Sequence, residues 1–123
     1  MSLKNIHCEN FSKKYNNEEI IEFKKAVIIP YTYISNIKGS NIRGRLLKFL
    51  CDKYHISKNQ QNLIKNLIHK IHNCSLILDD IEDNSKIRRG IECAHIKYGI
   101  ANSINSTYIV LFDMLHKIEN NNI

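Results

Sequence analysis

Apolar residues recur at helical spacing along most of the chain. The pattern predicts a short helix over residues 18–29 that ends near Pro30, followed by a connection over residues 31–40 that contains Gly39. A second helix is expected over residues 41–54. Its apolar face would carry four residues: Ile42, Leu46, Phe49 and Leu50.

The clearest helical pattern lies in the middle of the chain. Ser57 or Asn59 can cap a helix that runs to about Asp83. At about 1.5 Å per residue, this helix would be longer than about 30 Å. Its apolar and small residues follow helical spacing: Ile64, Leu67, Ile68, Ile71, Cys74, Ser75 and Leu78.

Two further elements are expected after a loop that contains Gly90. The first is a short helical segment over residues 94–98. The second is a long helix over residues 101–117. Its expected apolar stripe comprises Ile104, Tyr108, Leu111, Phe112, Leu115 and Ile118.

The composition favours an all-α protein. Only 4 Gly and 1 Pro interrupt the 123 residues, which is unlike a turn-rich β-fold. We expect a polar lead-in over residues 1–17 and one helical domain over residues 18–123. The chain shows no apolar signal region, and no stretch approaches the about 20 apolar residues of a membrane span.

Charge and cysteine usage narrow the class of partner. The net charge of +6 suits anionic ligands such as diphosphates. The basic residues are scattered, so nucleic acid is not expected as a partner. The four cysteines, Cys8, Cys51, Cys74 and Cys93, are widely spaced, which favours reduced thiols in a cytoplasmic protein over a disulfide framework.

An acidic run ends the long predicted helix. Asp79-Asp80-Ile81-Glu82-Asp83 places four acids in five residues. Because successive residues are about 100° apart, Asp79 and Asp83 share a face with His72. Acids one turn apart repel each other, and acids at a helix C-terminus oppose the helix dipole. A divalent cation would reverse both penalties, so the run predicts a Mg²⁺ site at Asp79 and Asp83.

Two adjacent arginines follow the acidic run. Arg88 and Arg89 supply fork-shaped donors for phosphate oxygens. Mg²⁺ bound by one or two carboxylates fills its other positions with water and phosphate oxygens. The two features together favour a site for a diphosphate. A solvated acidic helix end, neutralised by the arginine pair, is the simpler alternative.

The chain resembles the trans-isoprenyl diphosphate synthases. Residues 72–90, HNCSLILDDIEDNSKIRRG, resemble the first aspartate-rich motif of that family, and most closely that of eukaryotic geranylgeranyl diphosphate synthases. Similar segments cover roughly residues 18–115: 30–34, 39–43, 94–100 and 103–106. The resemblance implies an all-α helical array like the N-terminal half of the isoprenoid synthase (terpenoid synthase) fold.

The resemblance also implies an activity. Such a transferase joins an allylic diphosphate of the farnesyl type to isopentenyl diphosphate by Mg²⁺-assisted ionisation. Asp79, Asp80 and Asp83 would be catalytic, and Asp79 and Asp83 would hold Mg²⁺. Small residues before the motif, Cys74 and Ser75, would suit a C20 product.

Substrate-binding residues are carried over in the same way. Arg88 would bind the allylic diphosphate. Three residues would hold isopentenyl diphosphate: Arg43, His72 and Arg89. One position departs from the family's pattern, because Ser40 stands where a lysine usually follows Gly39, which leaves Lys38 as the possible substitute.

Because no second acidic cluster is present in the sequence, a function other than prenyl transfer is also considered. The family has a second aspartate-rich motif, and this chain has none, so a truncated form is expected. Its helices would lack their usual packing partners. The chain could then be a non-catalytic metal- and diphosphate-binding or regulatory subunit. Such a subunit would pair with itself or with a full-length synthase; a degenerate relic without activity is the third reading.

Overall fold

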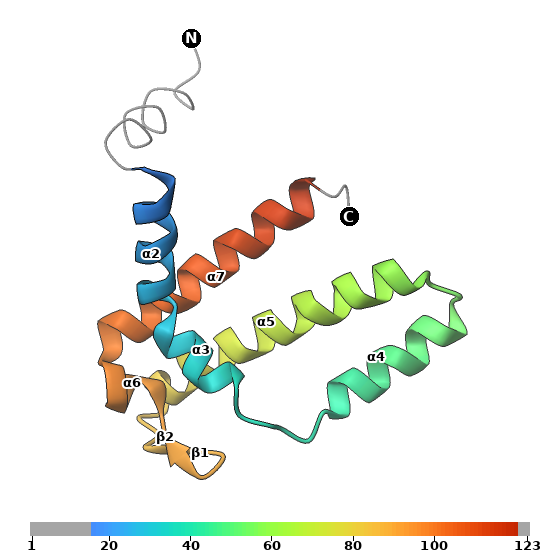
Figure 1. Cartoon of the computed structure of the whole chain (residues 1–123). Coiled ribbons are helices and arrows are strands. Elements are labelled where there is room, and N and C mark those ends of the chain that lie inside the picture. Colours follow the sequence, from blue (N-terminus) through green and yellow to red (C-terminus); the bar gives the residue numbers. More distant parts are fainter. Residues whose placement is uncertain (1–15, 121–123) are drawn as a thin grey trace.

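The computed structural model describes residues 16–120, and this part of the chain is helical apart from one short hairpin (Figure 1). The all-α prediction is therefore confirmed, while the expected lead-in lies almost wholly outside the described residues. The helices are α2 (Asn17–Val27), α3 (Ile29–Ser35), α4 (Ile42–Lys53), α5 (Lys58–Glu82), α6 (Ala94–Tyr98) and α7 (Ile100–Asn120). The hairpin comprises β1 (Ile87–Arg88) and β2 (Ile91–Glu92).

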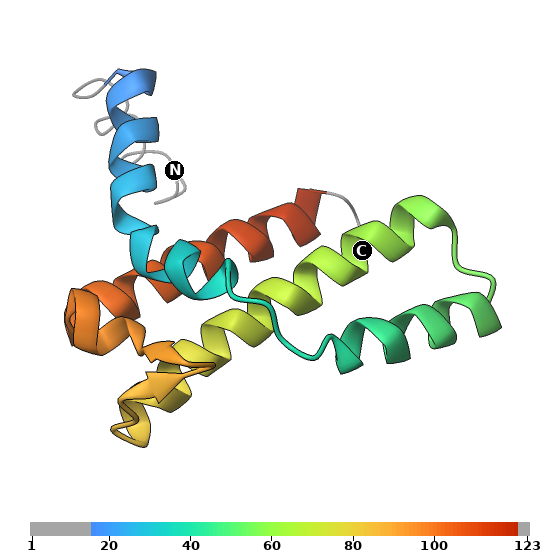
Figure 2. The same cartoon turned by 60° about the horizontal axis from the view of Figure 1, so that its bottom comes forward.

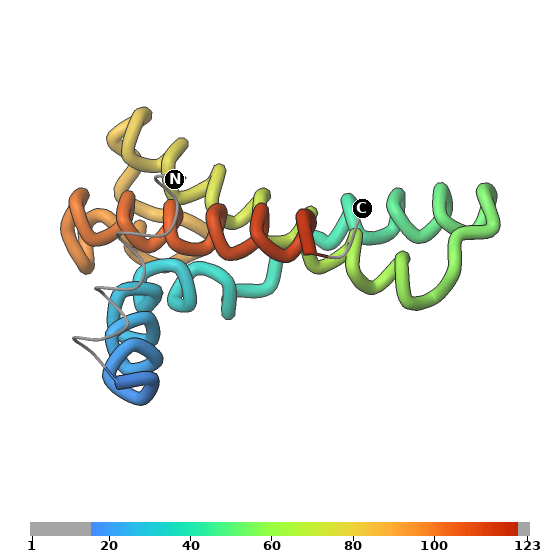
Figure 3. Tube along the Cα trace, turned by 90° about the horizontal axis from the view of Figure 1, so that it is seen from above, coloured from blue at the N-terminus to red at the C-terminus, as the bar shows by residue number. Residues whose placement is uncertain are grey.

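The long helix α5 is the axis of the structure. Helix α7 packs along one side of α5, and α4 runs antiparallel along another (Figure 1, Figure 2). Helices α3 and α6 pack near the end of α5 that leads into the hairpin. Helix α2 projects away from the layer formed by α4, α5 and α7 (Figure 3).

The core lies where α3, α5, α6 and α7 meet. Its buried members are Tyr31, Ile34, Cys74, Ile77, Ala94 and Val110. The buried positions of α5 are Asn73, Cys74, Ile77 and Asp80. This face is rotated from the predicted one, since Ser75 is exposed and Ile71 is 46% exposed.

The first predicted connection is partly wrong. Helix α2 ends at Val27, and Pro30 lies in the first turn of α3 instead of ending a helix. Proline is tolerated there because the first backbone N–H groups of a helix have no intrahelical acceptor. Helix α3 buries Tyr31 and Ile34, so only residues 36–41 remain as the connection.

Several other predicted boundaries are confirmed. Ser57 caps α5, where its Oγ accepts a hydrogen bond from the Gln60 backbone N–H. Helix α6 has the predicted bounds, and α7 extends slightly beyond its predicted ends. Within residues 16–120, no helix combines the length and apolarity needed to cross a membrane.

Half of the apolar stripe predicted for α7 is exposed, while Leu111 packs against the core. Phe112 is 65% exposed, and Tyr108 and Leu115 are more than half exposed. The face packed inward carries small and flexible residues: Ser103, Ser106, Thr107, Val110 and Met114. The three hydroxyls donate to backbone carbonyls three or four residues earlier, so their burial leaves no unpaired donor.

The apolar face predicted for α4 is exposed as well. Ile42, Leu46, Phe49 and Leu50 are 40–65% exposed. Cys51 is the one buried residue of this helix. Cys51, Cys74 and Cys93 are free thiols, and Cys8 lies outside the described residues.

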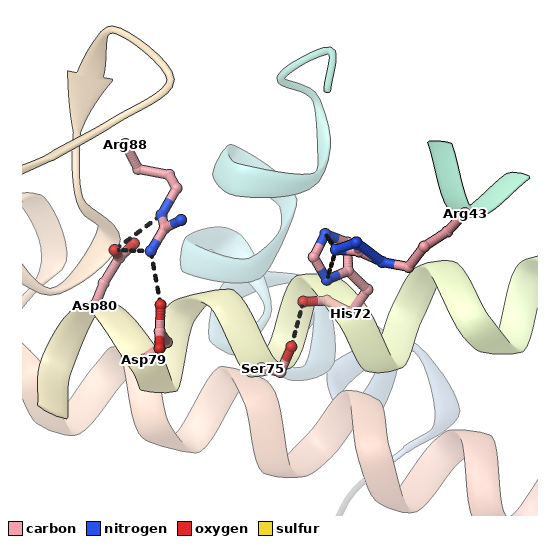
Figure 4. A network of polar contacts seen from close by, with 6 residues as sticks. All are labelled: Arg43, His72, Ser75, Asp79, Asp80 and Arg88. Atoms are coloured by element: carbon pink, nitrogen blue, oxygen red, sulfur yellow. Dashed lines mark hydrogen bonds and ion pairs between the residues drawn. The ribbon is translucent and has the colours of Figure 1, made fainter. Parts of the chain in front are cut away.

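A buried ion pair fixes the hairpin to α5. Asp80 is 1% exposed, and its Oδ1 accepts from Nε of Arg88 on β1 at 2.9 Å (Figure 4). Nη2 of Arg88 donates both to this oxygen and to Oδ2 of the exposed Asp79, at 2.5 and 2.9 Å. Burial and a hydrogen bond to Asp80 raise the pKa of the neighbouring Cys93 thiol to about 11.

Replacing Asp80 by Asn is expected to destabilise the fold. The substitution removes the buried counter-charge of the partly buried Arg88, which keeps Asp79 as its other partner, so a loss of about 2 kcal/mol of unfolding free energy is expected. Asp79→Asn is the matched control. Asp79 contacts the same arginine from an exposed position, so about 1 kcal/mol or less is expected there. Urea unfolding measures both values, and equal losses would contradict the structural role of Asp80.

Candidate functional site

Two exposed carboxylates lie at the end of α5. Asp79 and Asp83 are one turn apart, and the backbone N–H of Asp83 donates to the carbonyl of Asp79 at 2.8 Å. Both residues are exposed. Asp80 is not brought to this acidic ledge of Asp79 and Asp83, because it is buried against Arg88.

The acidic ledge has the composition of a magnesium site. Mg²⁺ usually takes one or two protein carboxylates and completes its shell with water and phosphate oxygens. Asp79 and Asp83 supply that number from adjacent turns. No group of three or more His, Cys, Asp or Glu side chains suited to a metal occurs in residues 16–120.

The hairpin turn places the second arginine away from the first. Arg89 and Gly90 are the two central residues of the turn, with φ of 51° and 85°. Positive φ at both positions is the pattern of a type I′ turn, whose twist matches the flanking strands. Arg89 lacks the conformational freedom of glycine, so its left-handed backbone costs about 1 kcal/mol or more.

Arg89 connects the hairpin to the segment that precedes α4. Its Nη1 donates to the carbonyl of Ile37 at 3.0 Å. A Cβ at Gly39 would lie 2.8 Å from Nη2 of Arg89, so glycine is required for the guanidinium to lie this close. The two adjacent arginines thus contact different parts of the structure. Arg88 contacts the acids at the end of α5, and Arg89 contacts the 36–41 connection.

A basic cleft of about 580 Å³ lies between this connection, α4 and α5. Six of its lining residues carry or can acquire positive charge: Lys38, Arg43, Lys65, His69, His72 and Arg89. None of the described residues that line it is Asp or Glu. Ser40 lines the cleft too, so the structure brings Lys38 and Ser40 to the same cavity as the three residues expected to hold isopentenyl diphosphate.

Arg43 and His72 are in close contact inside the basic cleft (Figure 4). Nη2 of Arg43 lies 2.6 Å from Nε2 and 2.8 Å from Nδ1 of His72. Since a neutral imidazole has one acceptor nitrogen, only one of these contacts can be a hydrogen bond. Burial lowers the pKa of His72, and the nearby charges of Arg43, Arg89, His69 and Arg88 lower it further. The free cleft therefore favours neutral His72.

Sequence reasoning missed several residues of this region. Lys65 and His69 precede His72 on the same face of α5, at spacings of four and three residues. That spacing could have pointed to them. The contact between Arg89 and Ile37 carries no sequence signal, because it joins a side chain to a backbone carbonyl 52 positions away.

The chain is similar to several known proteins. A family model described as polyprenyl synthetase matches residues 24–122. A geranylgeranyl pyrophosphate synthase of Hericium erinaceus is 40% identical over 74% of this chain and 27% of its own length. One of Mucor circinelloides f. lusitanicus is 33% identical over 96% of this chain and 37% of its own. A terpene synthase of Matsumurasca onukii is 36% identical over 84% of this chain and 34% of its own.

The similarity thus covers most of this chain and only about a quarter to two fifths of each of these relatives. The matched family model includes α3 to α7, and with them the acidic ledge, the hairpin and the basic cleft. The chain belongs to the polyprenyl synthetase family.

Proposed function

We propose that this chain acts as a geranylgeranyl diphosphate synthase-like prenyltransferase, condensing a farnesyl-type allylic diphosphate with isopentenyl diphosphate. The observation that carries the proposal is the pairing of an acidic ledge with a basic cleft on α5. The ledge comprises Asp79 and Asp83, and His72 faces the cleft. The similarity to geranylgeranyl pyrophosphate synthases supports the chosen product class.

The ledge would receive the allylic diphosphate. Mg²⁺ held by Asp79 and Asp83 would neutralise the charge that develops on the departing diphosphate. Arg88 contacts Asp79 from the hairpin, so its guanidinium would lie beside a diphosphate bound at the ledge. Asp80 would act by holding Arg88 in this position.

The basic cleft would receive isopentenyl diphosphate. Arg43 and Arg89 supply permanent positive charge, and His72 can add a donor or a charge. Lys38 lines the same cavity, so it would provide the cation that Ser40 lacks. The absence of carboxylates among the lining residues removes the repulsion that a diphosphate would otherwise meet.

Prenyl transfer should depend on Asp79. With Mg²⁺, farnesyl diphosphate and isopentenyl diphosphate, the chain is expected to form product slowly, and Asp79→Ala should lower the rate by about a hundredfold. Glu82→Ala is the matched control, since Glu82 is an exposed acid of the same run that is not assigned to the metal. Chromatography of radiolabelled product measures both rates. Product formation that survives Asp79→Ala would exclude the proposed metal role.

Binding of inorganic diphosphate should depend on pH through His72. The pKa of His72 lies below the ordinary 6.5 in the free protein, and a bound anion would raise it. Affinity should therefore rise as the pH falls through the raised pKa of the bound state, and it should level off below the lowered pKa of the free protein.

Calorimetry at several pH values tests this dependence, with His72→Gln as the comparison. Protonation of diphosphate itself affects both proteins equally. The wild type should show the steeper rise in affinity at low pH. Identical pH profiles would contradict a role for His72 in binding the anion.

The second candidate is a non-catalytic metal- and diphosphate-binding or regulatory subunit that pairs with itself or with a full-length synthase. Exposed apolar side chains favour it. Phe49 on α4 and Phe112 on α7 are each 65% exposed, and such surfaces often mark contacts with another protein. Mg²⁺-dependent diphosphate binding without product formation would favour this candidate over the first.

Self-association should be measurable by light scattering. The wild type is expected to show a mass above the 14.4 kDa of one chain, and Phe112→Asp should lower it by placing a charge in the apolar contact. Asn59→Asp adds the same charge at a polar exposed position and should change nothing. A wild type that stays monomeric at high concentration would argue against self-pairing.

A further inference from the structure

The basic cleft contains a second histidine that the proposed function does not use. His69 lines the cleft one turn before His72 on α5. Its Nε2 lies 3.0 Å from Nδ2 of Asn73. An amide nitrogen can only donate, so Nε2 must accept this hydrogen bond. Neutral His69 then carries its proton on Nδ1.

Asn73 is held in place by the core. It is 1% exposed and lies four residues after His69 on the same helix. Tyr31 of α3 lies beside it. Burial raises the pKa of the Tyr31 phenol, and a hydrogen bond to Asn73 partly offsets the rise. The contacts of Asn73 therefore run from the core to the ring of His69.

In their neutral forms, His72 accepts a hydrogen bond within the cleft, whereas His69 has a ring nitrogen left to donate one. His72 faces Arg43, so in its neutral form it accepts a hydrogen bond. His69 already accepts from Asn73, so its remaining ring nitrogen, Nδ1, is a donor. A donor in a cleft that also contains Lys65 and Arg89 suits an anion.

We propose that His69 is a further diphosphate-binding residue of the basic cleft, and that Asn73 is a positioning residue that keeps the proton on Nδ1 of His69. The inference rests on the proposed function of the cleft and extends its anion site by one turn of α5. Asn73 need not touch the ligand, since it acts through the tautomer of His69.

Calorimetry with inorganic diphosphate tests the contact. His69→Phe keeps an aromatic ring but removes the donor, so binding should weaken roughly tenfold. His116→Phe is the matched control, because His116 and Asn120 form the same pair at 3.0 Å on α7, away from the cleft. Unchanged affinity in His69→Phe would overturn the inference.

Nitrogen-15 NMR of the histidine rings tests the positioning role. The His69 signals, assigned by their loss in His69→Phe, should show a protonated Nδ1 and an unprotonated Nε2 in the wild type. Asn73→Leu should release this preference and weaken diphosphate binding. A wild-type ring protonated on Nε2 would overturn the inference, as would an Asn73→Leu variant that keeps both the tautomer and the affinity.

The failures of the two proposals are distinguishable. Diphosphate binding through His69 without product formation would contradict the proposed transferase activity and would still support this inference. A wild type that does not bind diphosphate would overturn both the inference and the proposed role of the cleft. Product formation together with unchanged binding in His69→Phe would overturn the inference alone.

Discussion

The buried ion pair between Asp80 and Arg88 is the constraint on which the rest of the site depends. A carboxylate removed from water requires a partner, and Arg88 provides it from the hairpin. Fixing Arg88 also fixes the turn that follows it. This turn directs the side chain of Arg89 to Ile37 and Gly39. The contact holds the 36–41 connection at the wall of the basic cleft. One buried charge thereby organises both halves of the candidate site.

Helix α5 carries a group of basic residues and a pair of acidic residues at two different places along its length. Lys65, His69 and His72 face the cleft near its middle, and Asp79 and Asp83 form the ledge at its end. At about 1.5 Å per residue, the seven residues from His72 to Asp79 correspond to about 10 Å. A helix of this length cannot easily bend to bring the two together. The acidic ledge and the α5 residues of the basic cleft therefore keep their spacing without help from a loop.

The sequence was sufficient for most of the helices and for the shared position of Asp79 and Asp83 at the end of α5, because helical spacing and the acidic run are local patterns. It was insufficient wherever packing between helices decided the outcome. Nothing local distinguishes the buried Asp80 from the exposed Asp79. The inward face of α7 includes small hydroxyl residues whose donors are satisfied within the helix, so hydrophobicity alone selected a stripe that is only partly buried. The hairpin was missed because Arg89 is an unusual residue for its turn.

The left-handed backbone of Arg89 also has a practical consequence for engineering this chain. Glycine or asparagine would relieve the turn of its strain, since both adopt positive φ more readily than arginine. A library of variants sorted only for resistance to heat would discard Arg89 wherever this relief exceeds the loss of its hydrogen bond to Ile37. The survivors would keep the helices and the hairpin while losing a cation of the cleft. Selection for thermal stability would favour replacing Arg89, whereas selection for the proposed diphosphate binding would favour keeping it.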